Sequence, residues 1–323
     1  MKAIVQDTYG SADVLGMEDV DMPVIGDDDV LVRVRAASLH VGDWHVMTGR
    51  PYLMRAMGFG LRAPGTRVRG TDVAGVVEAT GRGVTRFRPG DEVFGTCDGS
   101  LAEYARAGQD GLAPKPARLT FEQAAAVPVS ALAALQALRD AGGVRAGQKV
   151  LVIGASGGVG TFAVQLAKAF GAEVTGVCGT TALDLVRSIG ADHVVDYTRE
   201  DFAATGVRHD LIVDTAGNRP LSHLRRALTP RGTLVIVGAE GGGRWLGGTD
   251  RQLRALLLSP FVGQRLRGLI SKGNREDLAL LGELVGAGTV TPVVDRTYAL
   301  ADAAEAIRYL HRGHTRGKVV VTP

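Results

Sequence analysis

The stretch LVIGASGGVG, residues 151–160, decides the fold of this chain. An apolar run ends at Ile153, and the glycine-rich turn after it leads into a segment with helical spacing, GVGTFAVQLAKAFG. The order of strand, glycine-rich turn and helix is the setting in which the G-x-G-x-x-G fingerprint binds the pyrophosphate of a dinucleotide. In this chain the first glycine of the fingerprint is Ala155, so the turn has the form A-x-G-x-x-G.

The residue types of this turn suit a phosphate ligand. Backbone N–H groups at a helix N-terminus point at the pyrophosphate, and the helix dipole favours its charge. Gly157 lets the phosphate approach the backbone, Gly160 lets the helix pack closely on its strand, and Ala155 is workable if its φ is not positive. The predicted cofactor-binding residues here are Gly154, Ala155, Ser156, Gly157, Gly158, Val159 and Gly160. The alternative is a plain tight turn in an unrelated α/β protein.

Composition limits the classes of protein that the chain can belong to. It has 323 residues, enough for two domains, and a formal net charge of +3, which is too weak to indicate nucleic acid binding. Its 2 cysteines cannot form a disulfide framework or a zinc lobe. The N-terminal MKAIVQDTYG has no apolar signal core, and no apolar run is long enough for a membrane span. We therefore expect a cytoplasmic protein without a membrane span.

The pattern differs on the two sides of residue 121. Before it, pieces such as VLVRVRAAS, DVAGVVEATG and DEVFGT, separated by Gly, Pro and Asp, predict a curled sheet or small barrel. Thr120 and Gln123 then predict a capping box at the start of a helix. From Lys149 onward apolar strands alternate with helices, which predicts a parallel sheet covered on both faces. The fold class is α/β, and the final GKVVVTP is expected to rejoin one of the sheets.

The end of the second strand, EVTGVC, bears on which dinucleotide is bound. An acidic residue at this place normally binds the ribose 2′-hydroxyl of NAD. Here the chain reads CGTT, residues 178–181, without an acid, and the hydroxyls of Thr180 and Thr181 are available to donate to a 2′-phosphate. The sequence therefore favours NADP(H). Because this stretch carries no Lys or Arg, a balancing charge is expected from Arg316 or Lys318.

Motifs along the whole chain resemble the medium-chain dehydrogenase/reductase superfamily, in its zinc-independent quinone oxidoreductase-like branch. The motifs that carry the resemblance are YGSADVL, VLVRVRAASLHVGDW, GTDVAGVVEATG, RPGDEVFG, LAEYA, FEQAAAVPVSALAALQAL, GQKVLVIGASGGVGTFAVQLAKAFGAEVTGVC, IGADHVVDY, DTAG, GTLVIVG and GKVVVTP. The resemblance implies a doubly wound Rossmann sheet inserted in a GroES-like β-rich catalytic domain. The expected divisions are a GroES-like domain at 1–122, a dinucleotide-binding domain at 123–268 and a return to the catalytic domain at 269–323.

The same resemblance implies an activity. It implies NADPH-dependent transfer of a hydride to a quinone or an α,β-unsaturated carbonyl compound, without zinc, by a homodimer joined through the edge strands of its Rossmann sheets. One alternative is an NAD(P)-dependent carbonyl reductase or alcohol dehydrogenase that uses His40 or Tyr52 as the acid. The other is a non-catalytic NADPH-binding or RNA-binding protein, for which the basic segment 251–275 is the only support. We expect a small-molecule substrate and no nucleic acid partner.

Comparison with zinc-dependent members of the superfamily argues against a metal site. The position that matches the first cysteine ligand is His40, and the position that matches the histidine ligand is Thr71. A metal needs three or four such ligands at a catalytic centre. His40 with Asp43 and His45 leaves a metal interpretation open, but the expected interpretation is polar residues without a metal.

The remaining site residues come from the resemblance. The segment SLHVGDWHVMTGRPYLM supplies the catalytic candidates Tyr52, His40, His45 and Asp43. Tyr52 is the preferred proton donor or orienting group, His40 is a candidate donor to a carbonyl oxygen, and Asp43 is expected to hold local structure. The cofactor residues implied are Thr180, Thr181 and Tyr197 around the adenosine phosphate, Ala216 and Gly217 beside the nicotinamide ribose, and Gly238 at the nicotinamide pocket.

Overall fold

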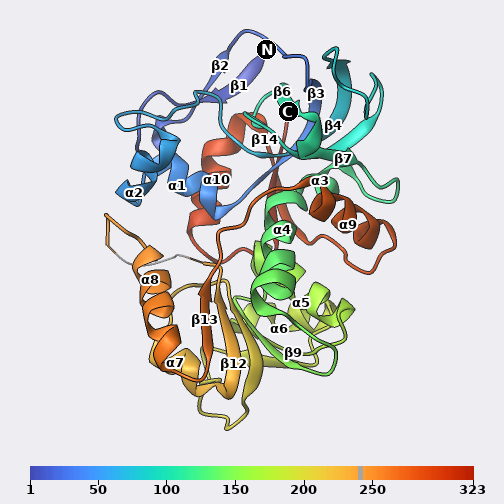
Figure 1. The fold of residues 1–323 in the computed structure, drawn as a ribbon. Helices are drawn as coiled ribbons and strands as arrows, with labels where there is room; N and C mark the ends of the chain where they lie inside the picture. The colour runs from blue at the N-terminus through green and yellow to red at the C-terminus, as the bar shows by residue number, and fades with distance from the viewer. Residues whose placement is uncertain (239–242) are drawn as a thin grey trace. The chain divides into compact units, whose positions relative to one another are not determined.

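The chain divides into two compact units. The computed structural model describes residues 1–238 and 243–323 (Figure 1). Unit 1 comprises Met1–Leu132, Gly273–Gly288 and Pro292–Pro323, and unit 2 comprises Ala133–Lys272 and Thr289–Thr291. Within the described ranges no helix is both long enough and apolar enough to cross a membrane.

Unit 2 is built on a six-stranded sheet in which every strand pair is parallel. In spatial order the strands are β10 (His193–Asp196), β9 (Glu173–Cys178), β8 (Lys149–Ile153), β11 (His209–Asp214), β12 (Leu228–Ile236) and β13 (Arg265–Gly268). This is the strand order of a dinucleotide-binding Rossmann sheet, with its reversal between β8 and β11. The predicted doubly wound parallel sheet is confirmed.

Helices connect these strands because the connection between parallel strands must cross over the sheet. They are α5 (Gly158–Ala169), α6 (Leu183–Ser188) after the 3-10 turn η5 (Thr180–Ala182), α7 (Leu221–Arg226), and α8 (Thr249–Leu258) with η6 (Ser259–Phe261). The helix α4 (Pro128–Gln136) and the π-helical turn η4 (Ala137–Gly142) precede β8 in the chain. Nearly all of α5 is buried from Gly160 to Ala167. The core on one face joins Leu151, Ile212 and Leu234 of three adjacent strands.

Unit 1 contains the β-rich part of the chain. Its main sheet has the order β14 (Val294–Ala299), β15 (Lys318–Thr322), β3 (Asp29–Leu39), β4 (Asp72–Thr80), β5 (Glu92–Thr96) and β7 (Leu112–Pro114), and β6 (Tyr104–Gly108) pairs with β3. β1 (Lys2–Val5) and β2 (Gly16–Asp19) form a separate antiparallel pair. The C-terminal strand β15 pairs antiparallel with β3, so the expectation that it rejoins a sheet is confirmed.

Short helices accompany the sheets of unit 1. They are η1 (Ala12–Val14), α1 (Val41–Thr48), α2 (Tyr52–Met54), the π-helical turn η2 (Arg55–Phe59), η3 (Gln109–Gly111), α3 (Phe121–Ala125), α9 (Arg275–Gly286), η7 (Leu300–Asp302) and α10 (Ala303–His311). The predicted capping box opens α3, where Thr120 Oγ1 accepts from Gln123 N at 3.2 Å and Gln123 Oε1 accepts from Thr120 N at 3.1 Å. In chain order α1 follows β3 directly, so this strand fixes where the candidate segment 40–52 begins.

Candidate functional site

The glycine-rich turn has the geometry of a phosphate-binding turn. β8 ends at Ile153 and α5 begins at Gly158, with Gly157 as its N-cap. Gly154 takes a φ of 79°, whereas no described residue other than glycine has a positive φ, so Ala155 fits its position without strain. The N-cap of α5 is a glycine, so the cap residue has no side chain to offer to the helix. Its first N–H groups have no partner within the helix, and an anion is the natural acceptor for them.

Two positions of the turn, 157 and 160, differ in whether the protein's own packing requires glycine. A Cβ on Gly160 would lie 2.0 Å from the carbonyl oxygen of Gly154, so close packing of α5 on the turn requires glycine there. A Cβ on Gly157 would meet only that same oxygen, at 3.4 Å, which is ordinary van der Waals contact. The protein itself therefore does not need a glycine at 157. The approach of a ligand to the backbone is the remaining physical reason for this residue.

The carboxyl ends of β8, β11 and β12 are joined at the turn. Thr215 Oγ1 donates to the carbonyl oxygen of Ile153 at 2.8 Å. Gly238 N donates to the carbonyl oxygen of Asp214 at 3.1 Å, and a Cβ on Gly238 would lie 3.2 Å from Gly217 N. The structure thus brings the predicted residues Ala216, Gly217 and Gly238 beside Gly154, as their shared sheet edge requires. This edge is where open α/β sheets bind ligands.

A buried ion pair lies behind this edge. Asp214 is fully buried, and its carboxylate accepts from Gly217 N at 3.0 Å and from the guanidinium of Arg251. Arg251 stands at the start of α8, in the basic segment 251–275. Its side chain is only 13% exposed, and its Nε and Nη1 have no hydrogen-bond partner among the described residues. Arg251 therefore belongs to the carboxyl edge of the sheet, which the hydrophobic periodicity of the sequence does not predict.

The region expected to hold the adenosine end contains an acid that sequence reasoning missed. The chain does lack an acid at the end of β9, but Asp196 ends the neighbouring strand β10 and stands opposite Cys178. Thr180 Oγ1 donates to Asp196 Oδ2 at 2.6 Å. Tyr197 follows directly, is 47% exposed, and lies against Gly179. The Thr180 hydroxyl, expected to donate to a phosphate, is therefore already donating to a carboxylate.

His40 and Asp43 form the first part of the predicted catalytic segment. Asp43 is buried, and its Oδ2 accepts from His40 N at 2.8 Å, which anchors the start of α1. The local structural role expected of Asp43 is what this bond provides. His40 Nε2 lies 3.6 Å from the same carboxylate oxygen and is buried without a hydrogen-bond partner among the described residues. A Cβ on Gly42 would lie 2.7 Å from the imidazole, so that glycine leaves room for the ring.

His45 is held as a neutral imidazole. Its Nδ1 lies 2.9 Å from the carbonyl oxygen of Arg50, and because a carbonyl only accepts, Nδ1 carries the hydrogen. Burial lowers the pKa of His45 below its ordinary value, although the bond to Arg50 acts in the opposite direction. A neutral ring with its hydrogen on Nδ1 presents Nε2 as an acceptor. His45 is thus less suited to donate a proton than His40 or Tyr52.

Tyr52 lies in an aromatic and cationic cluster. The guanidinium carbon of Arg55 lies 4.8 Å from the centre of the Tyr52 ring and 4.2 Å from that of Tyr9. Arg55 Nε also donates to the carbonyl oxygen of Gly49 at 2.9 Å. Contacts of a guanidinium with ring faces contribute about 0.5–1 kcal/mol each at partly exposed sites. Arg55 therefore helps to fix the orientation of Tyr52.

Both cations expected to balance a phosphate lie in unit 1. Lys318 is only 1% exposed, and its ammonium donates to Asp72 Oδ2 at 3.1 Å and to Ser130 Oγ at 3.0 Å. A lysine committed to a buried carboxylate in unit 1 is not available to a surface phosphate, so we withdraw it as a cofactor residue. Arg316 also belongs to unit 1, where its backbone N–H donates to Asp295 Oδ2 at 3.0 Å.

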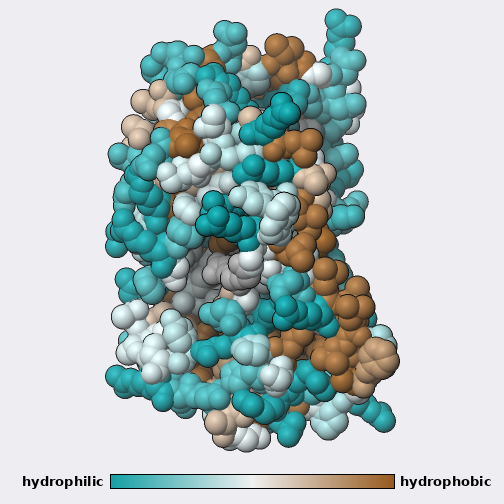
Figure 2. Space-filling model, turned by 90° about the vertical axis from the view of Figure 1, so that its left-hand side faces the viewer, coloured by the Kyte–Doolittle hydropathy of each residue, from teal (hydrophilic) through white to brown (hydrophobic). Residues whose placement is uncertain are grey.

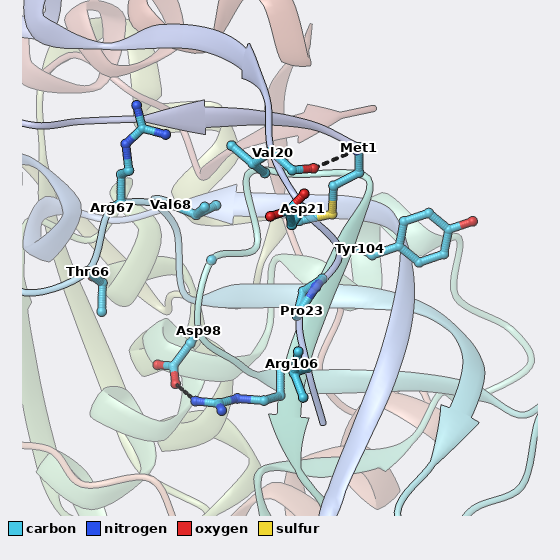
Figure 3. Close-up of a pocket in the computed structure, with 12 residues that line it drawn as sticks. Met1, Val20, Asp21, Pro23, Thr66, Arg67, Val68, Asp98, Tyr104 and Arg106 are labelled. Atoms are coloured by element: carbon cyan, nitrogen blue, oxygen red, sulfur yellow. Dashed lines mark hydrogen bonds and ion pairs between the residues drawn. The ribbon is translucent and has the colours of Figure 1, made fainter. Parts of the chain in front are cut away.

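Other concave or ligating features do not coincide with the predicted residues. A hollow in unit 1 is lined in part by Met1, Val20 and Val68, with the Arg106–Asp98 ion pair at its border (Figure 3). None of the predicted site residues lines it. Within residues 1–238 and 243–323, no three His, Cys, Asp or Glu side chains are grouped so that they could hold a metal ion. Metal independence itself stays a prediction.

Two family models match the chain. Residues 26–117 match the alcohol dehydrogenase GroES-like domain, and residues 189–321 match the family described as zinc-binding dehydrogenase. The chain is 33% identical to the chloroplast envelope quinone oxidoreductase homolog of Arabidopsis thaliana, over 100% of this chain and 98% of that protein. It is also 33% identical to 2-methylene-furan-3-one reductase of Solanum lycopersicum, over 100% of this chain and 79% of that protein.

Solved structures match the whole length of the chain as well. An NAD-dependent alcohol dehydrogenase matches with a TM-score of 0.85 and 31% identity, over 100% of both chains. Mycobacterial Rv1454c, solved in complex with NADPH, matches with a TM-score of 0.84 and 27% identity, again over 100% of both chains. The chain is an oxidoreductase with a nicotinamide cofactor, and it belongs to the medium-chain dehydrogenase/reductase superfamily, in the quinone oxidoreductase-like branch.

Proposed function

We propose that this chain transfers a hydride from NAD(P)H to a quinone or an α,β-unsaturated carbonyl compound without a metal ion. The observation that carries the proposal is the junction of β8, β11 and β12, where an uncapped helix N-terminus lies beside the glycines at 154, 157, 217 and 238. Such a junction suits a pyrophosphate and a nicotinamide ribose. The quinone and enone reductases among the relatives support the substrate class.

The backbone of unit 2 performs the binding part of this function. The N–H groups that open α5 bind the pyrophosphate, and Gly157 admits it to the backbone. Ala216, Gly217 and Gly238 have no bulky side chains, so they leave space for the ribose and the nicotinamide ring. A bound NAD(P)H supplies the hydride. Asp214 and Arg251 hold the loop at residues 215–217 in place through the bond from Gly217 N.

Side chains of unit 1 are proposed to handle the proton. When hydride is added to the β-carbon of an enone, negative charge develops on the carbonyl oxygen and a proton must be added at the α-carbon; a quinone takes up one hydride and one proton to become a hydroquinone. We assign the donor to the carbonyl oxygen to His40, whose Nε2 has no hydrogen-bond partner among the described residues. Tyr52, oriented by Arg55, is the proposed orienting or proton-donating hydroxyl.

One experiment separates this function from its alternatives. The purified protein, treated with a chelator, is mixed with NADH or NADPH and a panel of quinones and enones, and the products are identified by mass spectrometry. The proposal expects cofactor oxidation that survives chelation and yields a hydroquinone or a saturated ketone. An alcohol as the only product would indicate carbonyl reduction. Activity lost with the chelator and restored by zinc would contradict the metal-free mechanism.

We also propose that the chain forms a homodimer through unit 2. The side chains of Leu256, Leu257 and Phe261 on α8 and η6 are 63%, 71% and 85% exposed, and hydrophobic side chains gather on the side of unit 2 that carries α8 (Figure 2). The neighbouring strand β13 stands at the edge of the sheet. Leu257→Glu should shift the mass measured by light scattering to that of a monomer. The exposed Leu61→Glu of unit 1 is the control, and a monomeric parent protein would contradict the proposal.

A further inference from the structure

Three arginines line a pocket at the amino edge of the unit 2 sheet, where its strands begin. We call it the arginine pocket, and its lining residues are Arg208, Ser222, Arg225, Arg226, Pro230, Gly263 and Gln264. They come from the start of β11, from α7 and β12, and from the segment before β13, elements that are neighbours in unit 2 (Figure 1). β11 begins beside the pocket at His209 and ends at Asp214, about 16 Å away at the proposed cofactor edge. The pocket is therefore separate from the cofactor region.

Two of the guanidinium groups are held in place by neutral oxygen atoms. Arg208 Nη1 donates to the carbonyl oxygen of Leu228 at 3.0 Å. Arg225 Nε donates to Gln264 Oε1 at 2.9 Å, and Gln264 Nε2 donates back to the carbonyl oxygen of Arg225 at 2.9 Å. Each of these bonds uses one of the five N–H donors that a guanidinium carries. Both side chains are thus oriented, and further N–H groups are left for another acceptor.

No described carboxylate neutralises the arginine pocket. Among residues 1–238 and 243–323, no Asp or Glu oxygen lies within 4.0 Å of a nitrogen of its three arginines. Two acids of the surrounding loops have other partners, since Asp201 Oδ1 lies 2.6 Å from His223 Nε2 and Asp210 Oδ2 accepts from Lys149 N at 3.0 Å. Arg226 acts on Asp201 only at longer range. A cleft lined by charges of one sign concentrates ions of the opposite sign.

The charge and the size of the pocket indicate which anion fits it. A phosphate monoester carries a charge of about −1.5 to −2 at pH 7 and has three acceptor oxygens, so it matches three guanidinium groups better than a carboxylate does. The pocket has a volume of about 440 Å³, within the range of roughly 300–1,000 Å³ of small-molecule sites, so an organic body fits beside the phosphate. None of the lining residues is aromatic, so the pocket offers no surface on which a nucleobase would stack.

We propose that the arginine pocket binds a small, non-aromatic phosphate ester, such as a sugar phosphate. The phosphate accepts hydrogen bonds from the N–H groups that Arg208, Arg225 and Arg226 leave available, and Ser222 supplies a hydroxyl to the organic part. Guanidinium groups suit this task because pairs of their N–H groups match the oxygens of a phosphate. The inference does not depend on the proposed hydride transfer, because the pocket lies at the other end of β11.

The test is a calorimetric titration of the parent protein at constant ionic strength in a phosphate-free buffer. The probes are glucose 6-phosphate, inorganic phosphate and glucose. We expect saturable binding of one glucose 6-phosphate per chain, about tenfold tighter than inorganic phosphate, and no binding of glucose. Saturating NADH, which has no phosphate monoester, should leave this binding unchanged, because it occupies the turn at residues 154–160 and not the arginine pocket.

Variants separate the pocket from general positive charge. Arg226→Gln is the cleanest change, because this side chain forms no hydrogen bond within the described part of the chain, and it should weaken glucose 6-phosphate binding by about tenfold. Arg231→Gln is the matched control: it removes an exposed charge next to Pro230 that does not line the pocket, so the affinity should change by less than about twofold. Arg208→Gln, with the same expected loss as Arg226→Gln, keeps the test open if that variant does not fold.

Four results would overturn the inference. One is binding that does not saturate, or that is no tighter for glucose 6-phosphate than for inorganic phosphate. Another is an equal loss in Arg226→Gln and Arg231→Gln, because the arginines would then act only as general charge or offset the dipole of α7. The third is a single-stranded RNA oligomer that displaces glucose 6-phosphate with a steep salt dependence, which would indicate a nucleic acid surface. The fourth is binding seen only in Leu257→Glu protein, because the proposed dimer would then cover the pocket.

Discussion

The nucleotide-binding region of unit 2 is formed mainly by backbone groups, whereas the candidate catalytic segment of unit 1 is formed by side chains. The first consists of backbone: glycines at a sheet edge, N–H groups of a helix and carbonyl oxygens that join β8 to β11. The second consists of side chains that position one another. Asp43 accepts a hydrogen bond from the backbone of His40, and Arg55 contacts the rings of Tyr9 and Tyr52. The backbone region depends on which residues are small, and the side-chain region depends on which residues meet.

This difference explains why the sequence predicts the nucleotide-binding turn better than it predicts the contacts of the catalytic candidates. A glycine that must be small leaves a local signal in the sequence, because its neighbours in the turn are also its neighbours in the chain. A histidine that needs a particular carboxylate leaves no such signal when the partner comes from another element. We therefore expect substitutions in unit 2 to separate binding from stability cleanly, and substitutions in unit 1 to mix the two.

The largest effect is expected from Lys318→Met in unit 1. The change leaves Asp72, which is fully buried, without its ammonium partner, and Ser38 Oγ and Val129 N remain as its donors among the described residues. Loss of one partner of a buried ion pair costs about 3–5 kcal/mol. Denaturant unfolding should show a decrease of that size. Nucleotide affinity should stay unchanged, because Lys318 is committed to Asp72.

The double variant Asp72→Asn with Lys318→Met is the matched control. It removes both charges, so no lone buried charge remains, and it should regain part of the lost stability. A loss of NADPH affinity in well-folded Lys318→Met protein would instead restore the sequence-based role of this lysine as a phosphate partner.

The next largest effect is expected at two glycines of the turn. Substitution of Gly160 should lower stability, whereas substitution of Gly157 should lower cofactor affinity. Gly160→Val would place side-chain atoms against the carbonyl oxygen of Gly154, where even a Cβ would approach to 2.0 Å, and should cost about 1–3 kcal/mol of stability. Gly157→Ala meets only ordinary contacts, so stability should change by less than about 0.5 kcal/mol. Its affinity for the nicotinamide cofactor should nevertheless fall by about tenfold.

Thermal unfolding and cofactor titration, on the same two preparations, check this pair. If Gly157→Ala binds NADH as the parent does, the pyrophosphate is not held at this turn. If Gly160→Val keeps its stability, the close approach of α5 to the turn is not a structural requirement.

Sequence reasoning correctly predicted the parts of the fold that depend on local pattern. The alternation from residue 149 onward predicted the parallel sheet, and the Thr120–Gln123 spacing predicted a capping box that is present. The turn at residues 154–160 lies where it was predicted, because strand, turn and helix are contiguous in the chain. Nothing beyond nearest neighbours was needed for these predictions.

The residues that sequence reasoning misplaced all depend on partners distant in the chain. Lys318 pairs with Asp72, 246 positions away, and Arg251 pairs with Asp214 across the sheet edge. Asp196 reaches Thr180 only because β10 and β9 are adjacent and in a particular register. The sequence search for an acid examined the end of β9 only, whereas Asp196 ends β10. Pairings of this kind depend on which strands are neighbours and on their register, and neither can be read from a single sequence.

The smallest expected effect concerns one histidine in each unit, the half-buried His45 and the buried His209. Burial lowers the pKa of His45 in unit 1 and of His209 in unit 2 below the ordinary value of about 6.5. The unfolded chain therefore binds protons at a higher pH than the folded one does. The stability that each neutral ring contributes is complete above about pH 6.5 and is lost as the pH falls from there toward the folded pKa.

His45→Gln and His209→Gln should each reduce the loss of stability between pH 8 and pH 5, measured as the shift in the denaturant midpoint. Glutamine can still donate to the carbonyl oxygens of Arg50 and Ala227 that the imidazoles contact. The exposed His314→Gln should leave the shift as it is in the parent. The effect at 209 should be the larger, because that residue is only 2% exposed and its Nε2 has no partner among the described residues to offset burial. A larger effect at 45 would mean that the side-chain cluster of unit 1 excludes water more completely than the core of unit 2.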